Sequence, residues 1–199
     1  SLEYLSCRNN NLTSLDVSTC TRLYGLYCNY NNLTSLNVSG CTRLYELSCY
    51  NNSLTTLDVS HNTALNTLSC DGNALTSLDV SGCTALNTLS CFNNQLTSLD
   101  VSKNTALTYL NCNGNPFSTK AYNDIMCSLP SRNSGDDARF YPLENVNDTN
   151  SAIFLATNAS NATAKNWQVV YWNNDKSIST SGNYDCVTGY PPQANMSCY

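Results

Sequence analysis

Residues 65–75 read LNTLSCDGNAL, and the anchors of this stretch return every 21 residues through the first part of the chain. The shared pattern is L-x-x-L-x-C-x-x-N-x-L, and six units carry it between Leu2 and Phe117, which fills the last apolar slot of the sixth unit. A unit of this length cannot bury its apolar edge alone, so consecutive units must stack on one another. The sequence therefore predicts a solenoid of six coils over residues 1–117.

Each unit contains two segments with the alternation of a β-strand. In the L-x-C step, leucine and cysteine point inward and the residues between them point outward. The second half of the unit, such as LTSLDVSGCT at 75–84, alternates in the same way and predicts a short strand on the convex side. We expect the asparagine of each unit to bond backbone groups of neighbouring coils, forming a ladder of buried amides.

Nine of the twelve cysteines occupy two columns of the repeat. Side chains in register on parallel strands lie about 4.8 Å apart, whereas the Cβ atoms of a disulfide prefer about 3.8 Å. Asparagine also replaces cysteine in two slots of the second column, at Asn62 and Asn104. We therefore expect free, buried thiols that pack as small apolar groups, without disulfides or metal between them. The two columns are Cys7, Cys28, Cys49, Cys70, Cys91 and Cys112, and Cys20, Cys41 and Cys83.

This pattern resembles the leucine-rich repeat family, with cysteine where leucine usually stands, and in particular the 21-residue cysteine-bearing repeats of internalin J and of Bacteroidetes surface proteins. The resemblance covers residues 1–117. It implies an α/β solenoid, a right-handed leucine-rich repeat superhelix with a concave parallel β-sheet, short convex strands and a C-terminal α/β cap. It also implies an extracellular or cell-surface location, in a bacterium.

The period stops after Pro116, and residues 118–172 predict an α/β module that continues the sheet and covers the last coil. Residues 173–199 are rich in Asn, Ser, Gly and Pro and are expected to be irregular. At the other end Leu2 is already a repeat anchor, so we expect an upstream segment to be missing. The elements predicted for the module are a helix through Ser128 capped by Ser118 or Thr119, a strand at 138–143, a helix over about 150–165 capped by Asp148 or Thr149, and a strand at 167–172.

Three cysteines lie outside the two columns, at positions 127, 186 and 198. For an exported protein we predict a disulfide between Cys186 and Cys198. The oxidation state of Cys127 stays open.

Composition argues against several functional classes. The longest apolar runs are about four residues, far short of a membrane span. Nine basic residues and a net charge of −5 argue against nucleic acid. The single histidine, His61, excludes a multi-histidine metal site and is the only possible base for a Ser-His-Asp triad. The aspartates of the convex segments are expected to bond turn amides rather than calcium. We expect no cofactor, no metal and no enzymatic activity.

The outward positions of the repeat strands hold tyrosines concentrated in the second and third coils. Tyrosine supplies a large amphipathic contact area at low entropic cost and is enriched in interface cores, although aromatic residues also suit strands that bind nothing. We expect this concave face to bind a protein partner, with a glycan-binding surface or a structural spacer without a ligand as the alternatives. The predicted ligand-binding residues are Tyr24, Tyr27, Tyr30, Tyr45, Tyr50, Asp71, Phe92 and Tyr109.

Overall fold

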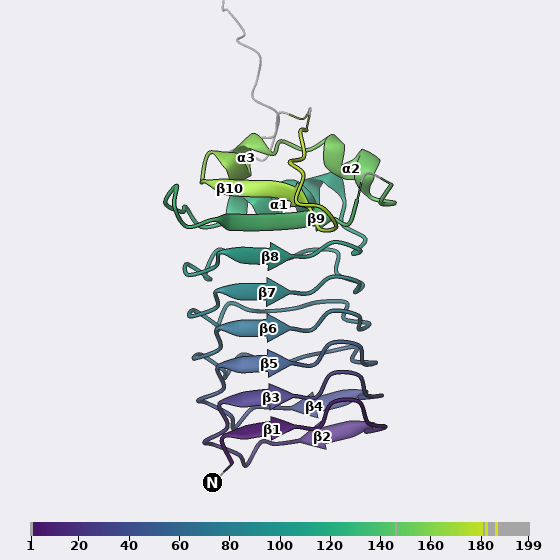
Figure 1. Cartoon of the computed structure of the whole chain (residues 1–199), viewed down its shortest axis with the longest axis vertical. Helices are drawn as coiled ribbons and strands as arrows, with labels where there is room; N and C mark the ends of the chain where they lie inside the picture. Colours follow the sequence, from purple (N-terminus) through teal and green to yellow (C-terminus); the bar gives the residue numbers. More distant parts are fainter. Residues whose placement is uncertain (1, 146, 181, 183–185, 187–199) are drawn as a thin grey trace, which may run out of the picture.

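The computed structural model describes residues 2–145, 147–180, 182 and 186. Parallel coils are stacked along the long axis, and the helices gather at the C-terminal end of the stack (Figure 1). One strand from each coil joins an eight-stranded parallel sheet in the order β1-β3-β5-β6-β7-β8-β9-β10. The predicted solenoid with a parallel sheet is therefore confirmed. The strands of this sheet are β1 (Tyr4–Ser6), β3 (Gly25–Tyr27), β5 (Glu46–Ser48), β6 (Thr67–Ser69), β7 (Thr88–Ser90), β8 (Tyr109–Asn111), β9 (Ala138–Leu143) and β10 (Trp167–Tyr171).

The core is built from equivalent residues that stack in register. Leu47 pairs with Leu68, and Leu68 pairs with Leu89, across neighbouring strands. Cysteine follows two positions later, and Cys49, Cys70 and Cys91 are fully buried. The nine column cysteines are free thiols, as predicted, although Cys7 and Cys20 in the first coil are only half-buried. Burial raises the pKa of the Cys49, Cys70 and Cys91 thiols well above the ordinary value, because charge is disfavoured inside the core.

The convex segments form strands only in the first two coils. β2 (Ser14–Asp16) pairs in parallel with β4 (Ser35–Asn37), and the later coils have no assigned convex strand. There, neighbouring segments are separated by clefts of about 270 Å³, one of them lined by Asp58 and Asp79. The prediction of a convex strand is therefore wrong for coils three to five, where neighbouring convex segments are not paired as strands.

The aspartates of the convex segments close local turns. The Oδ1 atoms of Asp58 and Asp79 accept a hydrogen bond from the backbone N–H of the serine two residues later, at 2.9 and 2.8 Å. These bonds stabilise the charged form and lower the pKa of both carboxyls. The expectation that these carboxylates bond turn amides is confirmed.

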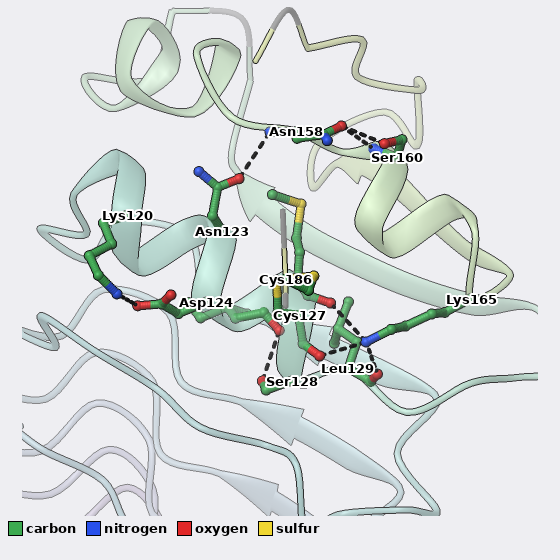
Figure 2. Close-up of a disulfide and its surroundings, with 12 residues drawn as sticks. Lys120, Asn123, Asp124, Cys127, Ser128, Leu129, Asn158, Ser160, Lys165 and Cys186 are labelled. Carbon is green, nitrogen blue, oxygen red and sulfur yellow. Dashed lines mark hydrogen bonds and ion pairs between the residues drawn. A yellow bond between two sulfur atoms is a disulfide. The ribbon is translucent and has the colours of Figure 1, made fainter. Parts of the chain in front are cut away.

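The residues after the sixth coil continue the sheet. β9 pairs with β8 and β10 pairs with β9, both in parallel. Helix α1 (Thr119–Ser128) connects β8 to β9 and begins as predicted, with the Ser118 hydroxyl accepting from the Ala121 N–H at 3.1 Å. At its other end Lys165 Nζ donates to the carbonyl oxygens of Cys127 and Leu129, at 2.6 and 2.9 Å (Figure 2). The lysine thereby supplies partners for carbonyls that the helix leaves unpaired.

The single helix predicted over 150–165 is instead two short ones, α2 (Ser151–Leu155) and α3 (Ser160–Thr163). The backbone N–H of Asn158 donates to the Asn123 side chain on α1, at 3.0 Å (Figure 2), and that of Ala159 donates to Thr180 Oγ1, at 2.7 Å. Because these donors bond outside the helix, the chain leaves the helical path between α2 and α3. Asn150 rather than the predicted Asp148 or Thr149 directly precedes α2 and makes no side-chain capping bond, although Asp148 Oδ1 accepts from the Asn150 N–H at 2.8 Å.

The disulfide predicted between Cys186 and Cys198 is wrong. Cys186 is bonded to Cys127, in the last turn of α1, with their Cα atoms 5.3 Å apart (Figure 2). Cys198 lies outside the described residues. After β10 the chain turns back, and the N–H of Gly182 donates to the Thr157 carbonyl at 2.8 Å. This return path leads Cys186 to a cysteine that is 59 positions away in sequence.

Candidate functional site

The outer face of the eight-stranded sheet, here called the concave face, is formed by the residues that alternate with the buried leucines. Register places these residues in straight columns along the stack, so that Gly25, Glu46 and Thr67 are neighbours. The next column contains Tyr27 and Ser48. Side chains from distant parts of the sequence are therefore brought into contact one coil apart.

Tyrosines from the first three coils form a stack along the edge where the strands begin. The rings of Tyr24 and Tyr45 are nearly parallel, with an interplanar angle of 8° and centroids 5.0 Å apart. Tyr4 extends the stack, with its ring centroid 5.7 Å from that of Tyr24. Gly25 makes room for Tyr4, because a Cβ atom at this position would lie 2.8 Å from the Tyr4 ring. Tyr24, Tyr45 and Tyr4 thus form one continuous aromatic surface.

Tyr27 lies in the middle of the same face and donates a hydrogen bond to Glu46 on the adjacent strand. The bond to a carboxylate favours the protonated phenol and raises the pKa of Tyr27 to about 12. Burial and the neighbouring Tyr45 and Tyr4 also raise the pKa of Tyr24. Both phenols therefore remain neutral hydrogen-bonding groups throughout the physiological pH range.

Tyr30 lies at the other edge of the face, in an uncommon backbone conformation. Its φ is +55° and the residue is 51% exposed, and its ring packs edge-on against Tyr50 with centroids 5.2 Å apart. A bulky residue in this left-handed region is strained. The other coils hold asparagine or glycine at the same position, all with positive φ: Asn9, Asn51, Gly72, Asn93 and Gly114.

Among the remaining predicted residues, Asp71 follows Tyr50 one coil further along the same column, where the Asn51 N–H donates to the Asp71 carbonyl at 2.9 Å, whereas Phe92 and Tyr109 lie further along the face. Asp71 is only 7% exposed. Burial raises the pKa of its carboxyl, and a hydrogen bond with Ser90 opposes the shift. Phe92 and Tyr109 belong to a second aromatic cluster at the C-terminal end of the face. The predicted set is therefore divided between two places on one surface.

The second cluster includes two residues that the sequence analysis did not select, Tyr141 and Trp172. The rings of Tyr109 and Tyr141 have centroids 5.2 Å apart, and Trp172 lies 5.3 Å from Tyr141 and 6.1 Å from Phe92. Tyr141 reaches the face because β9 aligns it with Asn111 of the last coil. The aromatic residues of the predicted strand at 138–143 could have indicated this, because that strand continues the column of Asn111 beyond the last repeat.

One cavity of the described residues lies between a convex segment and the C-terminal module. A cavity of about 450 Å³ is lined by Leu99 and Asp100 of a convex segment and by Ala121 and Cys127 of α1. Within the part of the chain that the structure describes, no group of three His, Cys, Asp or Glu side chains could hold a metal ion. Over the same residues, no helix is long and apolar enough to cross a membrane.

Comparison with known proteins points to one repeat family. A family model described as Leucine Rich Repeat matches residues 1–23. The functional domain of InlJ from Listeria monocytogenes, whose structure includes a cysteine ladder, is 27% identical and superposes with a TM-score of 0.50 over 89% of this chain and 46% of its own. No curated protein matches the chain.

Two further solved structures share the fold alone. A leucine-rich repeat protein of Leptospira interrogans is 19% identical, with a TM-score of 0.59 over 86% of this chain and 43% of its own. The internalin InlF of Listeria monocytogenes is 21% identical, with a TM-score of 0.50 over 86% of this chain and 55% of its own. The chain thus spans about half the length of these proteins. The repeat and the fold of this chain are thus similar to those of leucine-rich repeat proteins.

Proposed function

We propose that this chain is a non-catalytic recognition module of an exported or cell-surface bacterial protein, and that it binds a protein partner through the concave face. The leucine-rich repeat fold and the internalin-like neighbours indicate a protein-interaction module. The disulfide between Cys127 and Cys186 supports export, because such bonds persist in oxidising compartments.

The observation that carries the proposal is the backbone of Tyr30. The slot requires positive φ, and asparagine or glycine would fill it without strain, as they do in the other coils. A half-exposed tyrosine there costs stability, and such costs are found where a side chain serves function. The ring lies beside Tyr50 and extends the aromatic surface across the second and third coils.

The arrangement of the other tyrosines favours a protein partner at these coils. Tyr24 and Tyr45 turn one ring face each toward the other and Tyr4 packs against Tyr24, which reduces the open ring face and presents ring edges and hydroxyls to a ligand. A sugar stacks on an open ring face, whereas a protein surface can use edges, hydroxyls and the Tyr27–Glu46 pair as well. The proposed protein site is Tyr24, Tyr27, Tyr30, Tyr45 and Tyr50, with Asp71, Phe92 and Tyr109 extending the contact along the face.

A triple variant tests the proposal. Wild type and Tyr24→Ser/Tyr27→Ser/Tyr45→Ser would be compared by biolayer interferometry against an array of purified extracellular proteins. We expect the triple variant to lose affinity about tenfold or more for a protein that binds the wild type. The matched control, Thr55→Ala/Thr76→Ala/Thr97→Ala, alters exposed residues of the convex segments and should bind as the wild type does. Equal binding by the tyrosine variant, or no binding by the wild type as expected of a spacer, would contradict the proposal.

A further inference from the structure

Trp172 directly follows β10 and remains 42% exposed, although its ring contacts three other aromatic rings. It stacks on Phe92 and meets Tyr109 and Tyr141 edge-on, at interplanar angles of 84° and 87°. Phe92 lies beyond the end of β7 and Tyr109 begins β8, so the indole extends across the middle column of the face. Asn111 in that column is fully buried and its Nδ2 lacks a hydrogen-bond partner, whereas the equivalent Ser90 is half-exposed.

The turn that carries Trp172 is firmly anchored. The N–H of Trp172 donates to the Leu143 carbonyl at 3.0 Å. Three residues later, the Asp175 carboxylate accepts from the Tyr141 hydroxyl at 2.8 Å and from Arg139 at 2.9 Å. The exposed indole is therefore held in one place before any ligand arrives, which lowers the entropic cost of binding.

Charged groups that can bond hydroxyls lie beside Tyr141, whose ring contacts the indole. Arg139 forms ion pairs with both Asp175 and Asp137, so three of its five N–H groups are bonded and the others remain for a ligand; the Arg139 and Asp175 side chains are 33% and 55% exposed. A guanidinium offers a planar fork of donors and a carboxylate offers acceptors, a combination that suits pairs of adjacent hydroxyl groups. The outward positions of the neighbouring strands hold Thr67, Thr88, Ser69 and Ser90, and no aliphatic side chain.

A pyranose ring has the complementary chemistry, with an apolar C–H face and a rim of hydroxyls. We propose that Trp172, with Arg139 and Asp175 beside it, forms a subsite for one pyranose residue of a glycan at the C-terminal end of the concave face. This inference rests on the proposed function in using the same face, but its residues differ from those of the tyrosine variant.

Oligosaccharide titration tests the subsite. The probes are the linear hexasaccharides of β-1,4-glucose, β-1,4-N-acetylglucosamine, β-1,4-xylose and α-1,6-mannose at millimolar concentration. Saturation-transfer NMR reports the sugar protons that touch the protein, and tryptophan fluorescence reports the indole, because the chain's other tryptophan, Trp167, is buried. We expect at least one probe to show transfer to its ring C–H protons together with a change in fluorescence.

Variants distinguish binding at the subsite from non-specific binding. Trp172→Ala should lower the affinity for the probe at least tenfold. Arg139→Gln should lower this affinity several-fold, and the fluorescence change should be retained. Ile153→Ala, which removes another exposed apolar side chain, should change nothing. If the alanine variant lowers the unfolding temperature, Trp172→Tyr and Arg139→Gln carry the test. The tyrosine triple variant should still bind the probe, so the two proposals can fail separately. Binding of no probe, or unchanged binding by folded Trp172→Ala, would overturn the subsite.

Discussion

Asn94 and Cys70 are joined across the boundary between two coils: the Asn94 Nδ2 atom donates to the Cys70 carbonyl oxygen at 3.1 Å, although the residues lie 24 positions apart. The same amide donates to the Cys91 carbonyl at 3.1 Å, and its Oδ1 accepts from the Leu75 N–H at 3.0 Å. With a longer bond to the Phe92 carbonyl, at 3.3 Å, one side chain thus serves four backbone groups of the two coils. Asn31, Asn52, Asn73 and Asn115 repeat this arrangement.

Replacing Asn94 with alanine should destabilise the fold. The change leaves buried backbone groups without partners, each at a cost of ~1–3 kcal/mol. We expect the free energy of unfolding to fall by ~2–4 kcal/mol in urea titrations followed by circular dichroism. Gln95→Ala alters the exposed neighbour and should stay within ~0.5 kcal/mol of the wild type. Equal stability of the two variants would show that the amide ladder contributes little.

Tyr30→Asn should stabilise the protein. Asparagine adopts positive φ more readily than tyrosine and occupies this slot in the first, third and fifth coils. We expect a gain of ~1 kcal/mol, at the low end of the cost of a strained backbone residue, measured as a higher urea midpoint. In the binding assay described above, the same variant should bind more weakly. A stability loss would mean that the packing of Tyr30 on Tyr50 outweighs the strain.

Asp71→Asn should also stabilise the protein, and the gain should depend on pH. Burial raises the folded-state pKa of Asp71 above its ordinary value of 3.8, so its contribution to stability is fully present below that value and is lost as the pH rises through the folded pKa. The neutral amide avoids the cost of burying the charge. We expect a higher thermal midpoint for the variant at pH 7 and equal midpoints near pH 3. A lower midpoint for the variant at pH 7 would show that bonds to the carboxylate outweigh its burial.

The repeat region was predictable from sequence because every anchor has one physical role. Leucine and cysteine at a spacing of two required a strand, and the asparagine required backbone partners, so Leu68, Cys70 and Asn73 could be placed by pattern alone. The right-handed twist and the division of the chain at residues 117 and 172 remain predictions.

The parts that sequence reasoning missed depend on contacts between distant residues. Sequence reasoning paired Cys186 with Cys198, but the fold brings Cys127 next to it. The break between α2 and α3 depends on donors that bond Asn123 and Thr180. Trp172 joins Phe92 only because β9 and β10 extend the sheet. None of these partners is marked by a local pattern.

The central claim is that the column cysteines pack as reduced, apolar side chains inside the solenoid. Alkylation with iodoacetamide at pH 8, followed by peptide mass spectrometry, tests it most directly, since only an accessible thiolate reacts. In the native protein the half-buried Cys7 and Cys20 should react, while Cys49, Cys70 and Cys91 remain protected. In denaturant without reductant, all nine column cysteines should react, and Cys127 and Cys186 should not. Column cysteines that resist alkylation in denaturant, or Cys70 reacting in the native state, would contradict the account.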